Sequence, residues 1–220
     1  MKKLHFLLFL VCFSALGQNL AITNTNVVDV EHGTILEGYD VFLTDGKIHR
    51  IKKAGTLNLS NFEQLDGTNK YLTPGFIDAH VHFAMGPVKV KIEDQSPFLY
   101  VDLLDEFAKK TAKLLMAHGI TTTRDPGGKT EITVGMKRKV RKGEVLGPEM
   151  FVAGNILDTL NFGNLTTTVK NKEDVVKAVR AQAGQGVDFI KLYTSLSPEL
   201  LKAGIEEAER LGLESVSHLH

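Results

Sequence analysis

The stretch Leu72-Thr73-Pro74-Gly75-Phe76-Ile77-Asp78-Ala79-His80-Val81-His82 decides the fold. Its Pro-Gly pair is typical of a turn, and the apolar residues that follow predict a strand ending at His82. Side chains alternate between the two faces of a strand, so His80 and His82 are expected on the same side. Two neutral imidazoles placed in this way can bind zinc or a similar divalent ion. A histidine pair on a sheet surface, with no metal, is an equal alternative at this point.

The composition is that of an ordinary globular protein. Of 220 residues, 43% are hydrophobic and 24% are charged, and 26 Lys and Arg balance 26 Asp and Glu. The lack of net charge argues against a broad electrostatic surface for nucleic acid. Cys12 is the single cysteine, which excludes an intramolecular disulfide framework.

Residues 1–17 have the features of a secretory signal peptide. A basic start precedes an apolar run, and small residues occupy the two positions that a signal peptidase requires, which predicts cleavage before Gln18. The apolar run is too short to cross a membrane as a helix. We therefore expect a periplasmic or secreted protein that has no membrane anchor after cleavage.

Residues 18–73 predict the N-terminal part of a small β domain. The segments 21–30, 41–43 and 48–51 are rich in residues that favour strands. The Asp45-Gly46 pair between the last two of them is typical of a hairpin turn.

Strands and helices alternate after residue 74. Ser96-Pro97 and Ser197-Pro198 each combine an N-cap with a first-turn proline, and Asn171 is a further cap. The alternation predicts βαβ units on a parallel sheet, so residues 74–220 would form about the first half of a (β/α)8 TIM barrel, which takes about 250 residues. A doubly wound sheet is the alternative, but no glycine-rich phosphate loop follows the first strand. The predicted helices are 97–118, 130–142, 171–183 and 197–211, the strands are 120–124, 150–153, 187–193 and 214–220, and 155–170 is predicted as a long polar loop.

Four motifs resemble the metal-dependent amidohydrolase superfamily, in its prolidase and imidazolonepropionase-like branch. They follow the order of that family's first, second, fourth and fifth barrel strands: Pro74–His82, Gly119–Gly128, Gly186–Tyr193 and Ser217–His220. The ordered set is far more specific than any one motif. The resemblance implies a partial TIM barrel preceded by part of a small β-sandwich, in a chain truncated at its C-terminus.

The resemblance also implies a set of metal ligands. In the family, two first-strand histidines bind one metal, which assigns His80 and His82. A fourth-strand lysine forms a carbamate that bridges two metals, which assigns Lys191, and a fifth-strand histidine assigns His218. The expected cofactor is a pair of divalent ions, with zinc as the expected metal. From its position alone, a lysine that reaches solvent from a strand end is the favoured interpretation of Lys191.

Further residues are expected around these ligands. His220 shares a face with His218 and is the alternative ligand or an outer-shell residue. Tyr193 and Arg124 are candidates for substrate contact or the outer shell. A packing role at the barrel rim suits Tyr193 at least as well, and a salt link or turn cap is the favoured role of Arg124 and Asp125. The lysine-rich face at 137–142 is expected to be solvated.

The activity implied by the resemblance is hydrolysis of carbon-nitrogen bonds in amides or peptides, including Xaa-Pro dipeptides, by a metal-activated hydroxide. A later histidine and a catalytic aspartate are expected beyond residue 220, so the chain alone is expected to be inactive. The alternatives are an imidazolonepropionase-like cyclic amidohydrolase or deaminase with one metal, and a non-catalytic remnant. The expected partners are a small-molecule or dipeptide substrate and further copies of the chain in a homo-oligomer.

Overall fold

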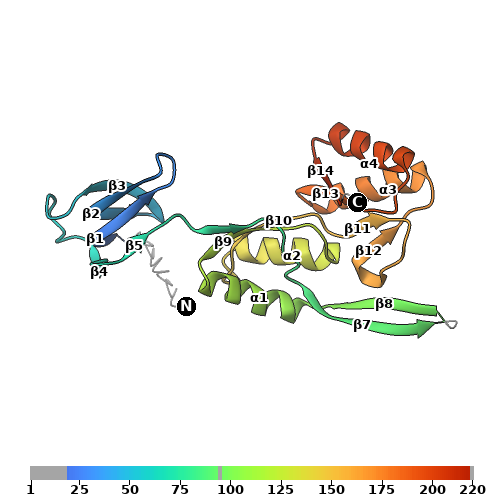
Figure 1. Cartoon of the computed structure of the whole chain (residues 1–220), viewed down its shortest axis with the longest axis horizontal. Coiled ribbons are helices and arrows are strands. Elements are labelled where there is room, and N and C mark those ends of the chain that lie inside the picture. Colours follow the sequence, from blue (N-terminus) through green and yellow to red (C-terminus); the bar gives the residue numbers. More distant parts are fainter. Residues whose placement is uncertain (1–18, 94–95, 219–220) are drawn as a thin grey trace, which may run out of the picture. The chain divides into compact units, whose positions relative to one another are not determined.

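The computed structural model describes residues 19–93 and 96–218. The chain divides between Pro74 and Gly75 into two compact units, and each is described by itself (Figure 1). The predicted signal peptide and His220 lie outside the described residues. Within the described residues, no helix is long and apolar enough to cross a membrane.

The first unit is a small β-sheet with the strand order β3-β2-β1-β4, and β5 also pairs with β1. Its three longest strands form antiparallel pairs, which confirms the strands predicted here. Asp45 and Gly46 connect β2 to β3 with positive φ angles of 52° and 71°. This backbone suits glycine and short polar residues, so the Asp-Gly pair forms the predicted hairpin turn. The strands are β1 (Leu20–Asp29), β2 (Thr34–Thr44), β3 (Lys47–Lys53), β4 (Glu63–Asp66) and β5 (Tyr71–Leu72).

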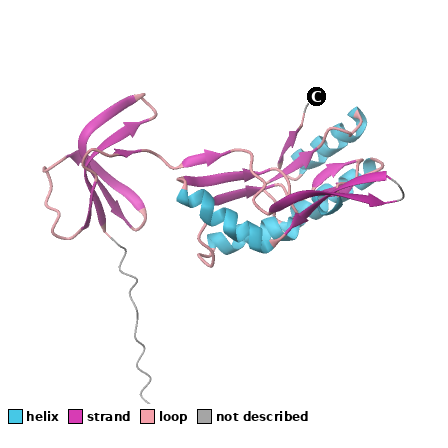
Figure 2. Cartoon of the chain, turned by 60° about the horizontal axis from the view of Figure 1, so that its bottom comes forward, coloured by secondary structure: helices cyan, strands magenta, loops and turns pink. Residues whose placement is uncertain are grey.

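The second unit contains both helices and strands (Figure 2). It has two parallel sheets, ordered β10-β9-β6 and β12-β11-β13-β14. The amide of Asp188 donates to the carbonyl of Val152 over 2.8 Å, so a backbone hydrogen bond joins the two sheets. This architecture confirms the α/β fold class and fits part of a TIM barrel. The strands are β6 (Phe76–Asp78), β7 (Met85–Glu93), β8 (Ser96–Leu103), β9 (Ile120–Asp125), β10 (Glu149–Val152), β11 (Ile156–Asp158), β12 (Thr166–Thr168), β13 (Phe189–Leu192) and β14 (Glu214–Ser217). The helices are α1 (Asp105–Ala117), α2 (Thr130–Arg141), η1 (Gly163–Leu165), α3 (Lys172–Gln185) and α4 (Pro198–Arg210).

Two predicted helix starts are confirmed. The Asn171 side chain accepts a hydrogen bond from the amide of Asp174 over 2.8 Å at the start of α3. Ser197 Oγ accepts from the amide of Leu200 over 3.4 Å, and Pro198 is the first residue of α4. These side chains satisfy amides that the first turn of a helix leaves without a partner.

The helix start predicted at Ser96-Pro97 is wrong. Residues 96–103 form β8, which pairs with β7 in an antiparallel hairpin, and α1 begins only at Asp105. The sequence from Val88 to Ile92 alternates apolar residues with lysine, which is the period-two pattern of a strand. Pairing with that strand keeps residues 96–103 extended and overrides the local capping signal.

The long polar loop predicted at 155–170 is also wrong, because this segment contains β11, η1 and β12. β11 is fully buried and pairs in parallel with β12, and its Leu157 pairs with Leu192 of β13. β12 consists of three threonines, whose branched Cβ atoms favour extended backbone. The polar composition of this segment therefore led to a loop prediction for a region that contains two strands.

The core of the second unit lies where its helices pack against the parallel strands. Close packing of α4 on β13 depends on Gly204, because a Cβ atom there would lie 2.8 Å from Leu192 Cδ2. The core is formed by buried apolar side chains that include Phe83, Met136, Met150, Val152, Leu157, Val175, Val179, Ile190 and Leu192.

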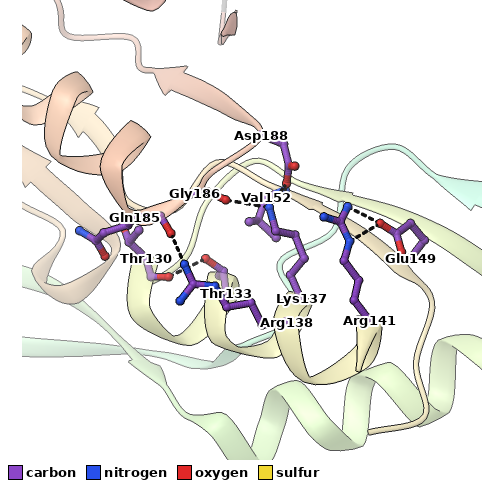
Figure 3. A network of polar contacts seen from close by, with 10 residues as sticks. All are labelled: Thr130, Thr133, Lys137, Arg138, Arg141, Glu149, Val152, Gln185, Gly186 and Asp188. Carbon is purple, nitrogen blue, oxygen red and sulfur yellow. Dashed lines mark hydrogen bonds and ion pairs between the residues drawn. The ribbon is translucent and has the colours of Figure 1, made fainter. Parts of the chain in front are cut away.

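A partly buried ion pair between Lys137 and Asp188 connects α2 to the junction of the two sheets (Figure 3). Lys137 Nζ donates to the carbonyl of Gly186 over 2.7 Å and to Asp188 Oδ2 over 2.9 Å. The amide of Val152 donates to the same carboxylate oxygen over 2.8 Å. Lys137 is only 6% exposed, so the prediction of a solvated lysine-rich face is wrong for this residue.

Glu207 of α4 forms ion pairs with two arginines. From these contacts we expect the fold to lose stability in acid. Arg180 Nε of α3 and Arg210 Nη2 lie 2.6 and 2.5 Å from Glu207 Oε1. The hydrogen bonds from Arg210 and Arg180 lower the pKa of Glu207 from 4.5 to about 2. A carboxylate with a lowered folded-state pKa stabilises the fold above its unfolded pKa and loses this effect as pH falls through the folded value.

We therefore expect the free energy of unfolding to decrease between pH 4.5 and about pH 2 as Glu207 is protonated. Urea unfolding across this range measures the effect. The Glu207→Gln variant should lose this component of the pH dependence, and an unchanged pH profile in that variant would show that Glu207 contributes nothing to it.

Candidate metal centre

A cavity of about 300 Å³ lies where parallel strands of the second unit end. In barrel enzymes, the carboxyl ends of the strands carry the active site. Three of the four predicted ligands, His80, Lys191 and His218, line this cavity together with Arg124. Pro126, Val216 and Ser217 complete the lining, so the cavity wall is formed by residues from four different strand ends.

His80 and His82 lie close together, but not on a strand. β6 ends at Asp78, whose carboxylate accepts a hydrogen bond from the amide of His80 over 3.0 Å. Such a side-chain turn competes with continued sheet pairing, so the prediction of a strand reaching His82 is wrong. The two imidazole rings are nevertheless neighbours, with their centres 5.4 Å apart and their planes at 75°.

A backbone carbonyl sets the tautomer of His82. Nδ1 of His82 lies 2.6 Å from the carbonyl oxygen of Gly127, which can only accept, so Nδ1 carries the proton. Nε2 then keeps the lone pair with which a neutral imidazole binds a metal. Asp125 Oδ1 lies 3.6 Å from Nδ1, and this carboxylate raises the pKa of His82.

His80 is in a more positive environment than His82. Partial burial lowers the pKa of His80, and the nearby His82, Lys191 and Arg124 lower it further. These effects favour the neutral imidazole of His80, which is the form that can bind a metal.

Lys191 is a buried amine without a polar partner. Its side chain on β13 is 4% exposed. Among the described residues, its Nζ makes no hydrogen bond or ion pair, and it lies 5.7 Å from the centre of the Tyr193 ring. Burial lowers the pKa of Lys191, and the charge of Arg124 lowers it further. Both effects favour the neutral amine, which is the form that reacts with carbon dioxide.

Tyr193 connects His218 with Lys191. His218 follows β14, and its ring centre lies 5.3 Å from that of Tyr193. On its other side, Tyr193 contacts Phe162 with a ring-centre distance of 6.4 Å. The structure therefore brings two candidate residues, His218 and Tyr193, into direct contact, while the alternative ligand His220 lies outside the described residues.

Arg124 lines the cavity and also contacts the chain next to the histidines. Its Nε donates to the carbonyl of Ala79 over 2.9 Å, and its own carbonyl accepts from the amide of Val81 over 3.1 Å. The guanidinium carbon lies 5.8 Å from the centre of the Phe189 ring. Arg124 thus lies beside the candidate ligands rather than on a distant surface.

Asp125 caps the turn that follows its strand, as the sequence predicted, but sequence reasoning missed its contact with the histidine segment. It is 1% exposed, and its carboxylate accepts from the amide of Phe83 over 3.2 Å and from the amide of Gly127 over 2.9 Å. Burial raises the pKa of Asp125, although His82 and the two amides act in the opposite direction. The signal was the Asp-Pro-Gly-Gly sequence after a strand, which reads equally well as an ordinary turn.

Within residues 19–93 and 96–218, no group of three or more His, Cys, Asp or Glu side chains is arranged to bind a metal ion. Lys191 is not one of these residue types, and His220 lies outside the described residues.

Comparison with known proteins identifies the family. The model of the amidohydrolase family matches residues 71–220. N-acetylglucosamine-6-phosphate deacetylase from Lysinibacillus sphaericus is 27% identical over 178 residues, which are 79% of this chain and 44% of that protein. Adenine deaminase 2 from Desulfotalea psychrophila is 33% identical over 104 residues, which are 47% of this chain and 14% of that protein.

Solved structures share the fold. A Bifidobacterium longum protein named as a prolidase superimposes with a TM-score of 0.77 at 23% identity, covering 92% of this chain and 49% of that chain. A Xaa-Pro dipeptidase with bound methionine superimposes with a TM-score of 0.74 at 20% identity, covering 92% and 57%. The chain spans about half the length of these structures. Since the family model covers more than half of the sequence and the fold agrees, the chain belongs to the amidohydrolase family.

Proposed function

We propose that this chain is part of a metal-dependent hydrolase of carbon-nitrogen bonds. The observation that carries the proposal is Lys191, a buried amine that has no polar partner in the described part of the chain and lines one cavity with His80 and His218. Amidohydrolases generally use divalent metals, and the similar proteins include a deacetylase, a deaminase and a dipeptidase.

The residues at the cavity and beside it fit a metal site. His82 does not line the cavity, but its ring neighbours that of His80, and its Nδ1 proton is bound to a carbonyl while Nε2 has no hydrogen bond among the described residues, which is the usual state of a metal-ligating histidine. Lys191, as a carbamate, would supply the oxygen ligands that the described part of the cavity wall otherwise lacks. We assign His80, His82, carbamylated Lys191 and His218 as the ligands of two divalent ions, with zinc as the expected metal. Ions bound there would lower the pKa of water and polarise a substrate carbonyl.

The other side chains of the cavity favour a substrate with an anionic group. Apart from the proposed ligands, its described lining contains the cation Arg124 and no Asp or Glu. Arg124 uses Nε to contact Ala79, which leaves its remaining donors for a planar carboxylate. A dipeptide has such a carboxylate, so small peptides, including Xaa-Pro dipeptides, are the proposed substrate class.

An exported location is part of the proposal. The basic and apolar start of the chain and the small residues before Gln18 support a cleaved signal peptide and a periplasmic or secreted mature protein.

Hydrolysis by the full-length protein tests the proposed function. We expect the purified protein to release amino acids from a panel of dipeptides, to lose this activity after dialysis against a chelator, and to regain it with Zn²⁺. A panel of N-acetylated sugars and nucleobases provides the comparison. Ammonia release from a nucleobase by a protein with one ion per chain would favour a deaminase, and activity that survives complete metal removal would contradict a metal-dependent hydrolase.

A further inference from the structure

The segment that carries the two histidines needs support from outside its own strand. β6 ends at Asp78, four residues before His82. Beyond that point, the segment is bound by the end of the neighbouring strand β9. Arg124 accounts for two hydrogen bonds, one to the carbonyl of Ala79 and one from the amide of Val81. The next residue of β9, Asp125, contacts the segment beyond Val81, at Phe83.

Asp125 uses both oxygens of its carboxylate in this support. Oδ2 accepts from the amide of Phe83 over 3.2 Å, directly after His82 in the chain. Oδ1 accepts from the amide of Gly127 over 2.9 Å, and the carbonyl of Gly127 accepts the Nδ1 proton of His82. The carboxylate therefore fixes the backbone next to His82 and, through Gly127, the group that orients the His82 ring.

The packing around the His82 ring leaves little room for another orientation. A Cβ atom on Gly127 would lie 3.1 Å from His82 Cε1 and 2.7 Å from Ile156 Cδ1. The imidazole is thus packed directly on the backbone of Gly127, and a small shift of this glycine would move or release it. Asp125 is 1% exposed, so water does not compete for its two hydrogen bonds.

We propose that Asp125 is the positioning residue of the metal site: through Phe83 and Gly127 it keeps His82 in one orientation with Nδ1 protonated and Nε2 free for a metal. Asp125 would itself touch neither metal nor substrate. The inference rests on the proposed function for the metal, but the orientation of His82 exists without it and can be measured separately. Groups that orient ligating histidines in this way contribute about 10–100-fold to metal affinity.

Two substitutions of Asp125 test whether this residue positions His82 or only stabilises the fold. Asp125→Asn keeps one acceptor oxygen but presents an NH₂ group to the other amide, and Asp125→Ala removes both acceptors. Asp188→Asn is the matched control, because Asp188 also accepts a backbone amide, that of Val152, and also lies in the second unit. Asp188 does not line the cavity.

The first readout uses the full-length protein without metal. Long-range ¹H–¹⁵N spectra, with His82 assigned through His82→Asn, should show a single Nδ1-protonated tautomer in the wild type and in Asp188→Asn. Asp125→Ala should show a mixture of tautomers, and Asp125→Asn a smaller change. A folded Asp125→Ala protein that keeps the wild-type tautomer would overturn the proposal.

The second readout is a Co²⁺ titration followed by visible absorbance. Metal affinity should fall about 10-fold or more in Asp125→Ala and stay within about 2-fold in Asp188→Asn. An equal loss in both variants would mean that Asp125 acts only through stability, which overturns the proposal. A wild-type protein that binds no Co²⁺ would refute the metal site, and the tautomer comparison would then still decide whether Asp125 positions His82.

Discussion

Replacing Lys191 with alanine is expected to remove at least one of two bound divalent ions and to reduce hydrolysis about 1,000-fold or more. Lys191 is the buried amine of the cavity, and as a carbamate it would be a ligand shared by both ions. Ions at such a site contribute several kcal/mol to stabilising the developing charge, and about 1.4 kcal/mol corresponds to a factor of ten in rate. Metal content by mass spectrometry and dipeptide hydrolysis measure the two effects on the full-length protein.

A buried lysine with another role is the matched control. Lys137 is 6% exposed, close to the 4% of Lys191, but it binds Gly186 and Asp188 and does not line the cavity. Lys137→Ala should keep both ions at a temperature where the variant is folded. Added acetate or propionate should partly restore activity to Lys191→Ala, because a carboxylate can replace the carbamate. Full metal content and full activity in Lys191→Ala would exclude the proposed ligand.

The same Lys137→Ala variant is expected to lower the free energy of unfolding by about 2 kcal/mol, the scale of a hydrogen bond to a charged group, because the Asp188 side chain is 22% exposed and stays partly solvated. Loss of Lys137 leaves the Asp188 carboxylate with the amide of Val152 as its one hydrogen-bond donor among the described residues, and leaves the carbonyl of Gly186 without this donor. Because these groups lie where the two parallel sheets meet, the contact stabilises the junction rather than one helix. Urea denaturation of the full-length protein measures the change.

A double-mutant cycle with Asp188→Asn isolates the pair. If the two residues act through each other, the double variant should be much less destabilised than the sum of the single variants. Additive effects would show that the pair does not contribute to stability. So would a decrease in the free energy of unfolding below about 0.5 kcal/mol in Lys137→Ala, which is the range of ordinary surface substitutions.

The parts of the fold that the sequence predicted are those with local signals. Asn171 and Ser197-Pro198 cap their helices because the capping groups belong to the same turn. The hairpin of β7 and β8 was missed because Ser96-Pro97 carries the same capping signal, while pairing with the strand before it is a longer-range effect. Local propensity alone cannot decide between these outcomes.

The candidate site was predictable in its residue types but not in its geometry. His80, Lys191 and His218 follow or end strands, and parallel strands bring such positions to one edge, where the cavity lies. The role of Asp125 depends on the end of β6 at Asp78, which leaves the histidine segment to be bound by β9. Nothing in the spacing of the two histidines indicates that their strand ends before them.

The metal centre proposed around Lys191 is tested most directly by a crystal structure of the full-length protein with anomalous data on both sides of the zinc absorption edge. We expect two zinc peaks beside His80, His82 and His218, and electron density extending from Lys191 Nζ to both of them. An unmodified Lys191 with no metal peak near it would contradict the proposed centre.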